Sequence, residues 1–205
     1  MCIRDRDLLQ SQLTPELVGL LSKSIGGEDR QKTAVAANGV FSVLLNALTR
    51  NAAKPEGLSG LLGALDRDHD GSILDDAVGL LSGMKAPQNS NMLNSAGMLR
   101  HILGEKQGNV VQNISKVSGL DAMDVGQLLL KLSPLVMGVL GKQKKTQQLD
   151  GNSLFEMLKG SATQQVKQNP EASIFEKILD SDGDGSIMDD IASIGFKTLG
   201  GLFKR

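Results

Sequence analysis

The chain has 205 residues, which is long enough to bury a core as one domain or as two small ones. Hydrophobic residues make up 40% of it and charged residues 22%, a balance typical of soluble globular proteins. With a formal net charge of −1 and no Trp or Tyr, the sequence offers neither basic clusters nor aromatic stacking platforms, which argues against nucleic acid as a partner.

Aliphatic side chains must build the core, because only 2% of the residues are aromatic. A core of Leu, Ile, Val, Met and Ala favours helices over sheets, so the sequence predicts an all-α fold, a multi-helix bundle. The richest apolar stretch, residues 128–140, is interrupted by Lys131 and Pro134. It is shorter than the about 20 residues that span a bilayer, so we expect no transmembrane segment.

Helices are predicted wherever a start signal precedes apolar residues at helical spacing. The first helix is expected to begin at Thr14-Pro15-Glu16, the second to run over about residues 28–51, the third to begin at Pro55 and the fourth to run from residue 73 to near Gly83. Two further helices are expected over residues 92–103 and 110–117. The last three are expected to begin at Asp121, at Asn152 or Ser153, and at Pro170.

Four features are expected to interrupt these helices. Gly26-Gly27 ends the first helix, and residues 85–91, rich in Pro and Asn, form a linker. Pro134 kinks or restarts the helix that begins at Asp121. Residues 142–145, of sequence K-Q-K-K, are expected to form a charged loop.

The two halves of the chain resemble each other. Residues 40–46 (V-F-S-V-L-L-N) are similar to residues 125–131 (V-G-Q-L-L-L-K), and a Pro-Glu pair precedes each of two acidic segments. This pattern indicates a divergent internal duplication. We predict a non-native or disordered leader over residues 1–12, a helical domain over 13–168, and a C-terminal helix–loop–helix unit over 169–205.

The chain ends add little about location. Residues 1–6 resemble a translated adapter remnant, so a missing signal peptide says little. Cys2, the single cysteine, cannot form an internal disulfide. The sequence therefore does not determine the cellular compartment, and of the possible compartments we favour the cytoplasm. The apolar tail from Ile187 onward is expected to pack on the body rather than on a membrane surface.

The two acidic segments carry the main functional signal. Residues 66–76 and 180–190 both read D-x-D-x-D-G-S-I-x-D-D, and together they hold ten of the sixteen Asp residues. A hard divalent cation requires six to eight oxygen ligands at about 2.3–2.6 Å, and alternate residues of a tight loop can supply them. The sequence therefore predicts two EF-hand-like calcium loops flanked by helices.

The predicted ligands follow the positions of such a loop, with Gly71 or Gly185 at the sharp turn and Ile73 or Ile187 directed into the core. The candidate metal ligands are Asp66, Asp68, Asp70, Ser72, Asp75 and Asp76 in the first loop and Asp180, Asp182, Asp184, Ser186, Asp189 and Asp190 in the second. The Ser residues would use their backbone carbonyls.

Both loops lack the usual Glu at position twelve, where Ala77 and Ile191 stand. The carboxylate of the tenth or eleventh residue must then replace the missing Glu ligand, or a water molecule must do so. We prefer the eleventh residues, Asp76 and Asp190, over the tenth, Asp75 and Asp189. We expect weak binding, with a Kd on the order of 10⁻⁵–10⁻³ M. The competing interpretation is a pair of polar turns that cap helices. However, two like charges about 4 Å apart cost roughly 4 kcal/mol at an effective dielectric near 20, and capping does not need five carboxylates.

Three further motifs resemble a known family: I-L-G at residues 102–104, I-S-x-x-x-G-L within 114–120, and L-L-L-x-L-S-P-L-V over 128–136. Their order is similar to that of the bacterial domain of unknown function numbered nine-three-seven, whose members include YidB-like proteins, over roughly residues 13–160. Members of that family often carry an acidic segment of the same type. The resemblance implies an all-helical bacterial protein, and it brings no catalytic residue, substrate or partner.

Catalytic signals are sparse. No phosphate-binding loop, zinc-protease motif or nucleophile elbow occurs, and His69, His101 and Cys2 lack suitable neighbours. We therefore expect a non-catalytic protein that binds calcium. One alternative is a calcium-independent scaffold or oligomerisation protein that uses residues 128–140 as its contact surface, so a protein partner or a homo-oligomer stays open. The other is an enzyme with an unrecognised carboxylate site.

Overall fold

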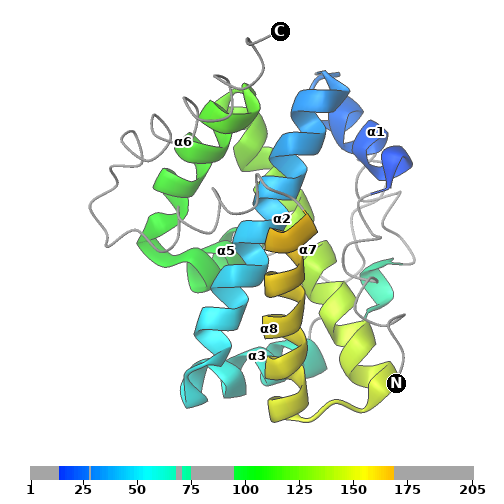
Figure 1. The fold of residues 1–205 in the computed structure, drawn as a ribbon, viewed down its shortest axis with the longest axis vertical. Helices are drawn as coiled ribbons and strands as arrows, with labels where there is room; N and C mark the ends of the chain where they lie inside the picture. Colours follow the sequence, from blue (N-terminus) through cyan, green and yellow to red (C-terminus); the bar gives the residue numbers. More distant parts are fainter. Residues whose placement is uncertain (1–13, 28, 68–70, 75–94, 169–205) are drawn as a thin grey trace, which may run out of the picture.

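The computed structural model describes residues 14–27, 29–67, 71–74 and 95–168 (Figure 1). Within these residues the secondary structure is helical and contains no strand. The helices are α1 (Pro15–Ser24), α2 (Arg30–Ala52), α3 (Pro55–Arg67), η1 (Ser72–Leu74), α5 (Ser95–Leu103), η3 (Gly104–Lys106), α6 (Gln107–Ser118), α7 (Ala122–Gln147) and α8 (Gly151–Gln168). The all-α prediction is confirmed.

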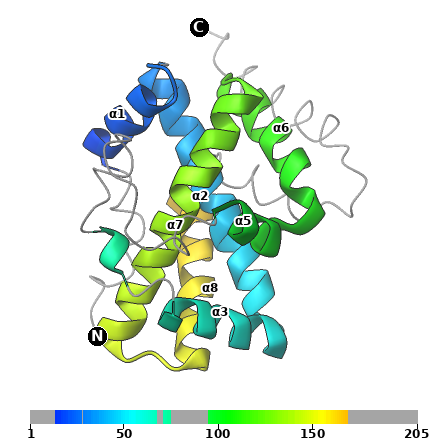
Figure 2. The ribbon, with the colours of Figure 1, turned by 180° about the vertical axis from the view of Figure 1, so that it is seen from behind.

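Helix α2 lies at the centre of the bundle. Among the described residues it contacts six α-helices: α1, α3, α5, α6, α7 and α8. In Figures 1 and 2 it runs along the long axis of the molecule, with α8 beside it and α7 crossing it. Its start is fixed by Asp29, whose Oδ1 accepts hydrogen bonds from Gln31 N at 2.7 Å and Lys32 N at 3.3 Å. Such a cap satisfies backbone donors that the first turn leaves unpaired.

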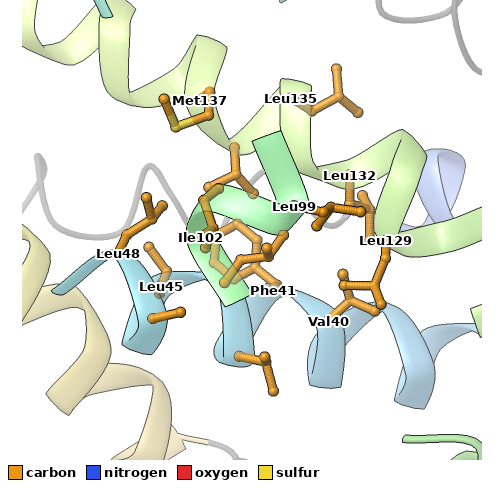
Figure 3. Close-up of a cluster of buried hydrophobic side chains, with 14 of the residues drawn as sticks. Val40, Phe41, Leu45, Leu48, Leu99, Ile102, Leu129, Leu132, Leu135 and Met137 are labelled. Atoms are coloured by element: carbon orange, nitrogen blue, oxygen red, sulfur yellow. The ribbon is translucent and has the colours of Figure 1, made fainter. Parts of the chain in front are cut away.

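The core is aliphatic, as the composition predicts. Phe41 of α2 is buried beside residues of α5 and α7, and Figure 3 shows it close to Leu99 and Ile102. Leu129 and Leu132 of α7 close the same cluster from the opposite side. Side chains from three helices thus meet in one apolar layer, and the burial of such residues is the main favourable term in folding.

The first helix follows its sequence signals. Thr14 Oγ1 accepts a hydrogen bond from Leu17 N at 3.3 Å, and Pro15 occupies the first helical position. The helix ends before Gly26 and Gly27, whose φ angles are +107° and +81°. Since residues with a Cβ rarely adopt such angles, the Gly-Gly pair ends the helix as predicted.

Helix α7 narrows one expectation and corrects another. It runs unbroken from Ala122 to Gln147 with Pro134 inside it, so of the two predicted effects of the proline, a kink or a restart, the restart does not occur. Ser133 Oγ donates to Leu129 O at 2.7 Å, in the turn where Pro134 supplies no N–H. Residues 142–145 are also helical rather than a loop, because lysines favour the negative end of a helix and the helix ends only where Gln148 turns left-handed at φ +51°.

Burial explains the apolar composition of α7. By length and composition alone this helix could cross a bilayer, but 67% of its apolar window is buried inside the fold, as in a core helix. Between residues 128 and 140 the apolar side chains are buried except Leu130, which is 40% exposed. This stretch is therefore not the contact surface that we considered for a scaffold protein.

Helix α8 completes the described bundle. Asp150 Oδ1 accepts a hydrogen bond from Ser153 N at 2.8 Å, so the helix begins at Gly151, close to the predicted start. Leu154 and Leu158 are fully buried. The predicted linker at residues 85–91 and the unit 169–205 lie outside the described residues. Of the helix predicted from residue 73 to near Gly83, only residues 73 and 74 are described, and they belong to η1. The internal duplication, which needs the second unit, stays a prediction.

Candidate functional site

The first acidic loop begins where α3 ends. Asp66 lies in the last turn of α3 with 63% of its side chain exposed, so the helix presents the first predicted ligand to solvent at the start of the loop. The next described residues of the loop are Gly71 and the three residues of η1. The other candidate ligands lie outside the described residues, apart from the backbone of Ser72: Asp68, Asp70, Asp75, Asp76, Asp180, Asp182, Asp184, Ser186, Asp189 and Asp190.

Gly71 makes the turn that the loop pattern requires. Its φ is +96°, a region that favours glycine, and its carbonyl accepts a hydrogen bond from Leu74 N at 3.1 Å. A Cβ at this position would stand 2.8 Å from Lys142 Cβ and 3.2 Å from Lys142 Cα. Glycine is therefore needed twice, for its backbone angle and for the close approach of the loop to α7.

Ile73 anchors the loop to the core. It is 3% exposed, as the prediction that it points inward requires. Its Cγ2 lies against Gly138 of α7, where an added Cβ would overlap it, and Leu74 flanks the same glycine. Figures 1 and 2 show η1 beside the C-terminal half of α7. Residues 73 and 74 of the acidic loop are thus held against a core helix by packing.

An ion pair joins the entrance of the loop to the same helix. Lys144 Nζ donates to Asp66 Oδ1, and the lysine side chain is 18% exposed. The two residues are 78 positions apart in sequence, so no local pattern pairs them. Sequence reasoning missed Lys144 because it placed residues 142–145 in a separate loop. The available signal was charge alone, since a basic run is the natural complement of an acidic one.

The described part of the loop contains one carboxylate, which alone is no metal site. Within residues 14–27, 29–67, 71–74 and 95–168, no three His, Cys, Asp or Glu side chains gather as a metal would need. His101, also within these residues, is exposed on α5 and lies 4.0 Å from the position of a Cβ added to Gly60. His69 and Cys2 lie outside the described residues. The geometry thus defines a turn, an anchor and a counter-charge around the loop.

Comparison with known proteins places the chain in a family. The profile of the bacterial proteins of unknown function called DUF937 matches residues 7–143, which is more than half of the chain. The chain belongs to this family. The comparison with curated proteins and that with solved structures find no match.

The DUF937 match covers a somewhat different range from the expected one. It begins at residue 7, inside the segment 1–12 that we assigned to a leader, and ends at residue 143 within α7. Asp66 and the rest of the first acidic loop lie inside the match, whereas Lys144, helix α8 and the second acidic loop follow it. The family, described only as bacterial and of unknown function, brings no activity to the site.

Proposed function

We propose that this DUF937 protein is a non-catalytic helical protein that binds Ca²⁺ through residues 66–76 and 180–190. The observation that carries the proposal is the arrangement of three residues at the start and in the middle of the first loop. An exposed Asp66 opens the loop, Gly71 turns it with φ +96°, and Ile73 is buried behind it. These are the roles that the first, sixth and eighth positions of a calcium-binding loop require.

Electrostatics supports a cation in each loop. Five carboxylates within eleven residues repel one another unless a positive charge lies among them, and a divalent ion is the most compact source of that charge. Because Ile73 is packed against Gly138, a change in the loop would be transmitted to α7. Calcium would therefore stabilise or reorient the helices that adjoin the loop.

Calorimetric titration of Ca²⁺ into chelator-stripped protein tests the proposal, with Mg²⁺ as the competing ion. We expect two sites with Kd on the order of 10⁻⁵–10⁻³ M. The variants Asp68→Asn and Asp182→Asn assign the heat to the first and second loop, and each should remove one site. Asp75→Asn compared with Asp76→Asn identifies the residue that completes the first loop.

Thermal unfolding provides an independent measurement. At a free Ca²⁺ concentration of one hundred times Kd, each site should add about 2.7 kcal/mol to the free energy of unfolding. Because the chain has no Trp or Tyr, far-UV circular dichroism is the suitable probe. Identical unfolding curves in chelator and in millimolar Ca²⁺ would contradict the proposal. Light scattering under both conditions separates a calcium effect on folding from one on oligomeric state.

A further inference from the structure

Lys144 places a positive charge beside the first predicted metal ligand of the first loop. The Lys144 ammonium contacts Asp66 Oδ1, the carboxylate that the loop pattern assigns to the first metal ligand. The lysine is mostly covered at 18% exposure, whereas Asp66 is mostly open at 63%. The ammonium therefore approaches the carboxylate from the protein side and leaves the solvent side free.

Packing limits how far this charge can move from the loop. Gly71 approaches the backbone of Lys142, with its Cβ position 3.2 Å from Lys142 Cα, and Ile73 is seated on Gly138. These two contacts hold η1 against the last turns of α7, on which Lys144 lies. A cation that enters the loop must then either displace the ammonium from Asp66 or accept a like charge close by.

We infer that Lys144 is a built-in counter-ion of the first loop and competes with Ca²⁺ for the Asp66 carboxylate. The inference rests on the proposed function, since it names what regulates the same site. It also explains how the fold tolerates several neighbouring carboxylates, because the lysine offsets part of the repulsion among them before the metal binds. The cost is a lower affinity for Ca²⁺ than the carboxylates alone would give.

The size of the competition follows from the exposure of Asp66. Ion pairs with a solvent-exposed partner contribute about 0.2–1 kcal/mol, which corresponds to at most about a fivefold change in an equilibrium constant. We therefore expect Lys144→Gln to lower the Kd of the first loop about two- to fivefold. The difference should shrink in 0.5 M salt, where the Debye length falls to about 4–5 Å.

The test uses the full chain with the second loop disabled by Asp180→Asn and Asp182→Asn, so that calorimetry reports the first loop alone. Lys144→Gln is compared with its parent, with Lys144→Arg, which keeps the charge, and with Lys116→Gln, which removes one charge from the exposed side of α6. Tighter Ca²⁺ binding by Lys144→Gln only, with Lys144→Arg and Lys116→Gln like the parent, supports the inference.

The outcomes separate the two proposals. If the parent binds Ca²⁺ but Lys144→Gln binds it equally or more weakly, the competition is overturned and the calcium site stands. If neither protein takes up Ca²⁺ while circular dichroism shows both folded, the first loop is not a calcium site, so the proposed function of this loop and the competition are both overturned. If Lys116→Gln tightens binding as much as Lys144→Gln, net charge rather than the Asp66 contact is responsible, and the inference is again overturned.

Discussion

Ile73 Cγ2 lies against the Cα of Gly138, so that the acidic loop and the core helix α7 share one close contact. Gly138→Ala would place a methyl group inside that contact. Overpacking costs about 1–3 kcal/mol, while alanine in a helix recovers up to about 1 kcal/mol. We expect a net loss of about 1 kcal/mol in the free energy of unfolding, measured by denaturant titration.

A matched control lies in the same helix. A Cβ added at Gly126 meets nothing within 4 Å, so Gly126→Ala should stabilise the protein by about 0.5–1 kcal/mol through helix propensity alone. Combining Gly138→Ala with Ile73→Ala should relieve the clash, because the methyl that overlaps is gone. Two additive substitutions would show that Ile73 does not contact Gly138.

Gly71→Ala tests the turn and the close approach together. The substitution forces a Cβ into φ +96° and to within 2.8 Å of Lys142 Cβ. A left-handed conformation alone costs about 1–2 kcal/mol, and the crowding adds to it, so we expect a loss of at least about 2 kcal/mol in unfolding free energy.

Gly27→Ala separates the two causes. Gly27 has a similar φ of +81°, but a Cβ there meets nothing within 4 Å. Its alanine variant therefore measures the backbone term, and the excess loss in Gly71→Ala measures the approach to α7. Equal losses of unfolding free energy in Gly71→Ala and Gly27→Ala would show that the loop does not pack closely against Lys142.

Local chemistry made much of this fold predictable. Thr14, the Gly26-Gly27 pair and Pro55 mark helix boundaries through hydrogen bonds and backbone angles that depend on neighbouring residues only, and α1 and α3 begin and end accordingly. The buried Ile73 and the left-handed Gly71 follow from the spacing of the loop pattern in the same way.

Non-local contacts explain what the sequence left open. Pro134 is tolerated inside α7 because tertiary packing buries that turn, which outweighs the lost hydrogen bond. The contact between Lys144 and Asp66 joins residues 78 positions apart, and only the fold brings them together. The remaining loop ligands lie outside the described residues, so their assignment still rests on spacing alone.

Helix α8 follows the residues matched to DUF937, yet it belongs to the core. Leu158 is fully buried, and α8 packs along α2. We expect Leu158→Ala to lower the free energy of unfolding by about 2–5 kcal/mol, as for other buried Leu→Ala changes. Met123→Ala, at a side chain that is 79% exposed, should change it by less than about 0.5 kcal/mol. Similar small effects at both positions would mean that α8 is not part of the cooperative unit.

The start of α8 gives the protein an acid-sensitive contact. Hydrogen bonds from the Ser153 side chain and backbone lower the pKa of Asp150 below its ordinary value. A depressed folded pKa means that the ionised form stabilises the fold fully above the ordinary Asp pKa of about 3.9 and that this contribution disappears as pH falls through the lower, folded value.

Asp150→Asn removes this titration while keeping a capping side chain. Comparing unfolding free energies of the two proteins between pH 2 and pH 6, we expect the advantage of the parent protein to be constant above about pH 5 and to fall below about pH 4. A difference that does not change with pH would show that the carboxylate of Asp150 is not favoured in its ionised form by the fold.

Ser42 presents an unusual case in the centre of the bundle. It is 1% exposed on α2, and its Oγ has no hydrogen-bond partner, as is also true of Asn46 Nδ2 one turn later. A buried polar group without a partner costs about 1–3 kcal/mol, and alanine also favours the helix. Ser42→Ala should therefore raise the free energy of unfolding by about 1 kcal/mol.

Ser133 provides the comparison, because it is equally buried in α7 but its Oγ donates to Leu129 O at 2.7 Å. Ser133→Ala should leave the protein about 1 kcal/mol less stable than Ser42→Ala does, since it removes a hydrogen bond that is made. Denaturant titration of both variants measures this difference in the free energy of unfolding. A loss of stability in Ser42→Ala would contradict the prediction, because it would mean that the Ser42 hydroxyl stabilises the fold.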